Sequence, residues 1–155
     1  QVAGRAGSAE RPGEVIVQSR HASHRILRLL SESNYVDLAK LLLTERKIAV
    51  MPPYAQLALI KADGPQLKAT IDLLKQIKSF STQLIQQSES TISSIGPMPA
   101  PMEKRAGRYR SQLLFKATSK PIMQRFLTQL VYQIESLKVS TGVKWSLDVD
   151  PQEMI

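Results

Sequence analysis

Cationic side chains are concentrated in one segment of the sequence, residues 98–125. Seven Lys and Arg residues stand there against a single acid, Glu103, so the segment holds a local excess of six charges out of the net charge of +8. Such side chains gain affinity for phosphates by displacing condensed counterions. The pattern favours a polyanionic partner, although charge alone does not distinguish DNA from RNA or lipid. The seven residues are Lys104, Arg105, Arg108, Arg110, Lys116, Lys120 and Arg125.

The spacing of these cations predicts a basic row on a strand. Arg108 and Arg110 alternate with Tyr109, so a strand would place the two arginines on one face. A basic row with Tyr109 nearby would combine phosphate contacts with base stacking, as single-strand binders do. The alternative is a solvated strand edge whose Lys and Arg discourage edge pairing. The candidate DNA-binding residues are Lys104, Arg105, Arg108, Tyr109, Arg110 and Lys120.

The remaining residues with metal-binding chemistry form no complete site. His21 and His24 are spaced to share a metal on a helix, but no Cys or obvious carboxylate completes the set, so surface positions at a helix start are expected. Asp148 and Asp150 lack a third ligand, and we expect a solvated pair near a strand end that faces Lys or Arg on a neighbouring strand. Trp145 is expected in the core. The sequence therefore predicts no metal site.

The hydrophobic periods that follow Pro52-Pro53 alternate between those of strands and helices. Their order, β-α-β-β-α-β, predicts an α+β fold of the ferredoxin-like type, with two helices on one face of a four-stranded antiparallel sheet. Residues 79–81 could break the first helix. The expected elements are strands 55–62, 91–95, 109–117 and 143–149, helices 66–87 and from Pro121, and a Pro-rich loop 96–107.

A second, smaller region precedes Pro52-Pro53, a pair that cannot continue a helix. It contains an expected strand at residues 13–18 and helices at 22–31 and 34–50, the latter capped by Asn34. The domains are therefore expected at 1–50 and 51–155, and the second is expected to fold alone. The chain opens in a Gly-rich turn and not with Met, which indicates a piece of a longer protein.

Composition restricts the possible functions. There is no Cys, which excludes disulfides and thiolate metal sites. No stretch has the roughly 18 apolar residues of a membrane span, and no signal peptide is visible, so a cytoplasmic protein without membrane contact is expected. Neither a phosphate-binding Gly-x-x-x-x-Gly-Lys-Ser/Thr loop nor an Asp-Glu magnesium motif is present. This chain alone is not expected to hydrolyse ATP.

Five separated segments resemble one family, in the same order. The opening Gln1-x-x-Gly4-Arg5 resembles motif six of superfamily-two helicases. With it, residues 1–18, 51–54, 96–100, 104–112 and 144–151 resemble the primosomal replication-restart helicases (primosomal protein N-prime, PriA-type) along the whole chain. Where the family pattern ends in Gly-Arg-x-Gly-Arg, the last position here is Ser8, which removes one of two motif arginines.

The resemblance implies both an architecture and a function. Residues 1–50 would end the second RecA-like lobe, with Gln1, Gly4 and Arg5 as an ATP-contacting remnant, and residues 51–155 would be a C-terminal domain that binds branched or single-stranded DNA. The family unwinds DNA in the 3′–5′ direction at stalled forks, assembles the primosome and contacts single-stranded DNA-binding protein. ATP, magnesium and zinc are implied for the full-length family, and no cofactor is expected in this chain.

Two alternatives stay open beside that interpretation. A stand-alone ferredoxin-like module that binds RNA would show the same order of elements, because many functions share this fold. The chain could also belong to an active ATPase once the missing lobes are supplied, and Ser8 counts against this possibility.

Overall fold

The structure consists of two compact units. It is a computed structural model that describes residues 7–8, 11–12, 14–21, 23–32, 34–88 and 91–151. The first unit is Gln1–Glu45 and the second is Arg46–Ile155. The division lies inside helix α2 (Tyr35–Ile48), a few residues before the expected domain start at Met51.

The first unit contains short elements without a core of their own. Strands β1 (Gly7–Ser8) and β2 (Arg11–Pro12) pair antiparallel, and α1 (Arg25–Ser31) precedes α2. Asn34 caps α2 as expected, because its Oδ1 accepts a hydrogen bond from the Asp37 backbone N at 3.1 Å. In the part of the chain that the structure describes, neither α1 nor α2 has a buried side chain.

One expectation in this unit is wrong and another is not addressed. A strand was expected at residues 13–18, but residues 14–18 and the following Ser19 have no regular structure. Among the described residues, no strand pairs with this segment to satisfy its backbone hydrogen bonds. The proposed ATP-contacting residues Gln1, Gly4 and Arg5 lie outside the described residues, whereas Ser8 lies in β1.

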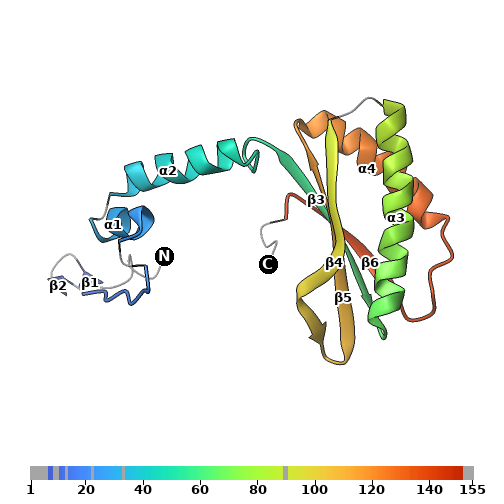
Figure 1. Ribbon diagram of the computed structural model, residues 1–155, viewed down its shortest axis with the longest axis horizontal. Coiled ribbons are helices and arrows are strands. Elements are labelled where there is room, and N and C mark those ends of the chain that lie inside the picture. Colours follow the sequence, from blue (N-terminus) through green and yellow to red (C-terminus); the bar gives the residue numbers. More distant parts are fainter. Residues whose placement is uncertain are drawn as a thin grey trace. The chain divides into compact units, whose positions relative to one another are not determined.

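The second unit has the predicted order of elements. Its sheet has the strand order β4-β5-β3-β6, and every neighbouring pair is antiparallel. Helices α3 and α4 cover the same face of the sheet (Figure 1). This arrangement confirms the α+β, ferredoxin-like prediction. The elements are β3 (Gln56–Gly64), α3 (Leu67–Ser88), β4 (Ile92–Arg105), β5 (Arg108–Ala117), α4 (Lys120–Glu135) and β6 (Lys144–Val149).

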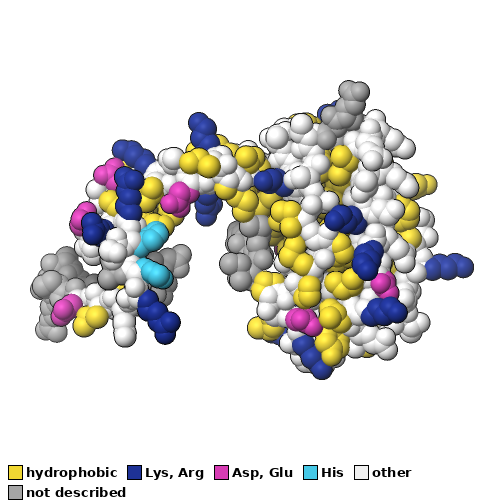
Figure 2. Space-filling model, in the orientation of Figure 1, with side chains coloured by type: hydrophobic (Ala, Val, Ile, Leu, Met, Phe, Trp, Pro, Cys, Tyr) yellow, Lys and Arg dark blue, Asp and Glu magenta, His cyan; other side chains and the backbone are white. Residues whose placement is uncertain are grey.

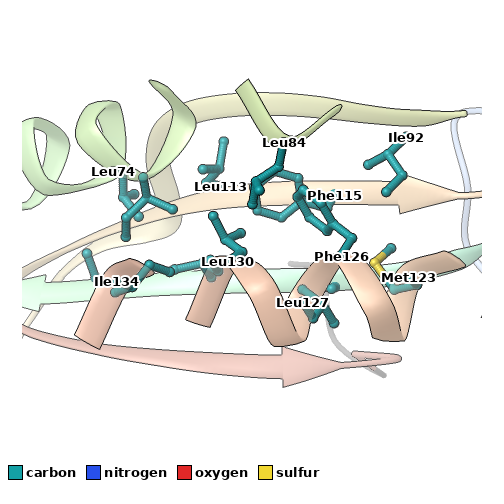
Figure 3. Packing of buried hydrophobic residues seen from close by; sticks show 14 of the residues in the cluster. Leu74, Leu84, Ile92, Leu113, Phe115, Met123, Phe126, Leu127, Leu130 and Ile134 are labelled. Carbon is teal, nitrogen blue, oxygen red and sulfur yellow. The ribbon is translucent and has the colours of Figure 1, made fainter. Parts of the chain in front are cut away.

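The core lies between the sheet and the two helices. Leu113 and Phe115 of β5 are fully buried, and the Phe115 ring meets the edge of Phe126 of α4 with ring centroids 5.0 Å apart. Leu130 and Ile134 continue the same stripe of α4, and both are 0% exposed. Figure 3 shows these side chains converging from the helices and β5. Trp145 packs against this cluster from β6, as expected.

Two predicted features of the second unit are corrected. The expected loop 96–107 is mostly strand, because β4 continues to Arg105 and pairs with β5 through two register shifts. Prolines are tolerated there because β4 is an edge strand, where a missing N–H costs no ladder hydrogen bond. Helix α3 does not break at residues 79–81. The hydroxyl of Ser81 instead donates to the Lys78 carbonyl oxygen at 2.7 Å within a continuous helix.

The first register shift depends on a glycine. Gly96 has a φ of +107°, and an added Cβ would lie 2.9 Å from the backbone oxygen of Gln112 on the paired strand. Both the dihedral angle and the space therefore exclude a side chain. The Gly96 carbonyl oxygen also accepts a hydrogen bond from Lys78 Nζ at 2.5 Å, which ties the bulge to α3.

We predict that Gly96→Ala lowers the free energy of unfolding by at least about 2 kcal/mol, because it adds backbone strain and a contact with rigid backbone. Urea denaturation measures the change. Gly107→Ala is the matched control, because Gly107 also has a positive φ but its Cβ would meet nothing within 4 Å. The control should lose about 1 kcal/mol. Equal losses for the two variants would contradict the packing argument.

We also predict that residues 51–155 fold alone. The buried cluster draws only on residues between Ala58 and Val143, so the separated piece retains all of it. Thermal unfolding followed by circular dichroism should show one cooperative transition. Leu130→Ala in that piece should lower stability by about 2–5 kcal/mol. A gradual, non-cooperative signal from the unmutated piece would place the domain boundary elsewhere.

Candidate nucleic-acid interface

A tight hairpin brings four of the seven cations of the 98–125 segment, Lys104, Arg105, Arg108 and Arg110, to one end of the sheet. The turn residues Ala106 and Gly107 have φ values of 49° and 78°, the pair of positive angles that a two-residue type I′ turn requires. Across the turn Arg105 pairs with Arg108, and Lys104 pairs with Tyr109. The hairpin turn joins β4 to β5 at one end of the sheet (Figure 1). It brings Arg105 and Arg108 directly opposite each other on the two strands.

Strand β5 carries the predicted basic row. Ser111 and Leu113 are 0% exposed and face the helices. The residues that alternate with them are half-buried and lie on the other face of the sheet, which we name the outer face. The members of β5 on the outer face are Arg108, Arg110, Gln112, Leu114 and Lys116.

Arg108 is engaged in holding the sheet together. Its Nε forms an ion pair with Oδ1 of Asp63 on β3, and its Nη2 donates to the carbonyl oxygens of Asp63 at 3.2 Å and Gly142 at 2.8 Å. The Arg108 side chain therefore joins β5 to β3 and to the turn before β6. Because its side chain is 37% exposed, the stabilisation by the ion pair itself is modest.

Two further cations flank the same carboxylate. Arg110 on β5 and Lys144 on β6 are the direct cross-strand neighbours of Asp63, one on each side. Among the described residues, neither forms an ion pair with an acidic side chain. We name Arg105, Arg108, Arg110 and Lys144 the basic cluster.

Three charged residues of the outer face were not identified from the sequence. Asp63 and Lys144 were not singled out, and neither was Lys61, whose Nζ contacts Asp148 Oδ2 at 2.8 Å. The useful signal was the alternation of charged with apolar residues in β3 and β6, combined with strand pairing. The contact to Lys61 confirms the expectation that Asp148 faces a cation on a neighbouring strand.

Three of the proposed DNA-binding residues lie apart from the outer-face row. The Tyr109 side chain is on the opposite face of β5 from Arg108 and Arg110, and Lys104 Nζ lies 4.8 Å from its ring centroid in a cation–π contact. Lys120 begins α4, beyond the other end of β5, a strand of ten residues that spans about 30 Å. The structure therefore groups Arg105, Arg108 and Arg110 on the outer face, and it separates Lys104, Tyr109 and Lys120 from them.

Figure 2 shows Lys and Arg side chains distributed over the visible face of the second unit with few acids among them. No group of three or more His, Cys, Asp or Glu side chains suited to a metal occurs among the described residues. His24 instead caps α1, since its Nδ1 accepts from the Ile26 backbone N at 3.3 Å. Of the helices within the described ranges, none combines the length and apolarity needed to cross a membrane.

We predict that Arg108 and Arg110 differ in their contributions to stability. Arg108→Ala removes an ion pair and two hydrogen bonds to carbonyl oxygens, so it should lower the free energy of unfolding by about 1–2 kcal/mol. Arg110→Ala, the matched control two residues along the same face, should change it by less than about 0.5 kcal/mol. Chemical denaturation of both variants measures this difference, and a larger loss for Arg110→Ala would refute the assignment of Arg108 as the structural arginine.

Comparison with known proteins identifies the family to which the chain is similar. Residues 47–152 match the primosomal protein N C-terminal domain family. The chain is 39% identical over 155 residues to the replication restart protein PriA of Haemophilus influenzae, covering 99% of this chain and 20% of that protein. Identity to the PriA of Synechocystis sp. is 31% over 153 residues, covering 97% and 17%.

The match to Bacillus subtilis PriA is weaker, with 26% identity over 155 residues, covering 100% of this chain and 19% of that protein. The chain thus spans about a fifth of the length of these relatives. Among solved structures, a de novo designed protein aligns with a TM-score of 0.44 and 13% identity over 64% of this chain and 99% of its own, too weak a likeness for any functional argument. By the family match, which covers residues 47–152, the chain belongs to the primosomal protein N C-terminal domain family.

Proposed function

We propose that this chain is the DNA-binding C-terminal part of a replication restart protein, and that the basic cluster contacts the phosphate backbone. The observation that carries this proposal is the placement of Arg108, Arg110 and Lys144 around one carboxylate, Asp63, with Arg105 paired to Arg108 at the hairpin end of the sheet. The names of its relatives, replication restart proteins, favour DNA as the polyanion.

The arrangement suits a backbone of regularly spaced phosphates. Arg110 and Lys144 stand on β5 and β6 with β3 between them, so their Cα atoms are about 10 Å apart at the usual spacing of neighbouring strands. Asp63 offsets one charge, that of Arg108, and within the described residues Arg105, Arg110 and Lys144 form no ion pair. Each phosphate that they neutralise releases condensed counterions, which gives affinity that falls with salt.

The wider activity belongs to the longer protein. We propose that it is an ATP-dependent 3′–5′ helicase that recognises stalled or branched replication forks and assembles the primosome, and that single-stranded DNA-binding protein and primosome proteins are its partners. ATP, magnesium and zinc would be bound by parts beyond this chain, whose own sequence has no phosphate-binding loop. On this proposal the chain supplies DNA and partner binding and does not hydrolyse ATP alone.

Fluorescence anisotropy with labelled forked DNA, single-stranded DNA and a matched RNA, each across a salt series, tests the proposal. We expect tighter binding to DNA than to RNA. Arg110→Ala should weaken DNA binding several-fold and reduce the salt slope by about 1, as the loss of one phosphate contact requires. Lys75→Ala, an exposed cation on α3, is the matched control and should leave both quantities nearly unchanged.

The alternatives have distinct results in the same experiment. Binding to RNA as tight as to DNA would favour the RNA-binding module. Absence of DNA binding at low salt would reject the proposal and leave the basic cluster as a surface for a protein partner. Equal losses for Arg110→Ala and Lys75→Ala would indicate attraction by the net charge of the chain instead of contact at the cluster.

A further inference from the structure

The second register shift between β4 and β5 leaves a stretch of the edge strand standing out from the sheet. Pro99 pairs with Ser111, and the next paired residues are Lys104 and Tyr109. Residues 100–103 of β4 therefore face a single residue, Arg110, on β5. We name residues 100–103 the bulge. Bulges of edge strands commonly re-aim side chains and end pairing.

The bulge presents an apolar side chain among cations. Met102 is 57% exposed, and Pro101 beside it is also exposed. Lys104 and Arg105 follow at once, and Arg110 is the residue that the bulge faces. A single exposed apolar residue is ordinary on a protein surface. Met102 differs from such a residue because it lies in the bulge, next to cationic side chains that can bind phosphates.

This combination matches the chemistry of duplex DNA better than that of an apolar protein surface. Proteins that bind the minor groove insert Met, Pro and similar side chains between base steps while Arg and Lys contact the flanking backbone. The prolines at 99 and 101 restrict the backbone of the bulge before binding, which lowers the entropy lost on insertion. Glu103 is the one acidic residue of the bulge, and it is exposed to solvent and counterions.

We propose that the bulge is a wedge for duplex DNA, with Met102 inserted between base pairs from the minor groove and with Lys104 and Arg105 on the adjacent phosphates. This inference rests on the proposed function and deepens it. Phosphate contacts of the basic cluster serve single and double strands alike, whereas insertion of Met102 requires stacked base pairs. The bulge therefore gives the surface its preference for duplex arms over single strands.

Duplex DNA that carries 2-aminopurine, whose fluorescence rises when the base is unstacked, tests this directly with the full chain. We expect the unmutated chain to raise the fluorescence on binding. Met102→Ala should abolish most of that rise and weaken duplex binding about five-fold, equivalent to about 1 kcal/mol. Affinity for a single strand of the same length should change less than about two-fold. Tyr132→Ala, an exposed apolar side chain on α4, is the matched control and should change nothing.

The outcomes separate this inference from the proposed function. If Arg110→Ala weakens DNA binding while Met102→Ala leaves both the duplex affinity and the fluorescence unchanged, the wedge is rejected and the DNA-binding surface stands. Equal weakening of single-strand and duplex binding by Met102→Ala also rejects the wedge. If the unmutated chain binds no DNA at low salt, both proposals fail. Thermal unfolding of Met102→Ala should match that of the unmutated chain, because the exposed side chain leaves the core intact.

Discussion

The pleat of strand β5 is the constraint on which both the core and the candidate interface depend. One set of alternate residues, including Leu113 and Phe115, is buried against the helices, and the other set, including Arg108 and Arg110, lies on the outer face. A slip of one residue in pairing would exchange the two sets and bury the arginines. The hydrophobic core therefore fixes the orientation of the basic row, because the register that buries Phe115 is the same one that presents Arg110.

Asp63 is the electrostatic counterpart of that constraint. Cations directly opposite or diagonal to one another on neighbouring strands repel, and the hairpin end collects several of them. A carboxylate placed between β5 and β6 reduces this repulsion and orients Arg108 through an ion pair. Because the ion pair is partly exposed, it adds little to the stability of the fold. Its main effect is to fix the orientation of the Arg108 side chain. One cation of the cluster is thus committed to the fold, and the others are available to an anionic partner.

The sequence predicted the order of elements in the second unit because its apolar residues repeat clearly with the periods of strands and helices. It also predicted the alternation of Arg108 and Arg110 with buried neighbours, the cap at Asn34 and the core position of Trp145. It predicted the start of β4 but not its continuation beyond Ile95, since Pro97, Pro99 and Pro101 suggest a loop unless the strand is known to lie at an edge. Nor could it find Asp63 and Lys144 in the cluster, because their neighbours are set by strand order, a long-range property. The separation of Lys120 from the cluster has the same cause.

The distance between Lys120 and the basic cluster limits how DNA could bind along β5. About 30 Å along β5 corresponds to the rise of roughly nine base pairs at 3.4 Å each. A duplex that reached from the hairpin end to Lys120 would have to cross the middle of the outer face, where Leu114 of β5 lies opposite the buried Leu59 of β3. Both leucines are uncharged and cannot bind phosphate. Lys116, the next outer-face residue of β5, donates a hydrogen bond from its Nζ to the Ala49 carbonyl oxygen at 3.5 Å. A continuous phosphate track along β5 is therefore unfavourable, and the favourable anion site is confined to the hairpin end, where the charges converge from β4, β5 and β6.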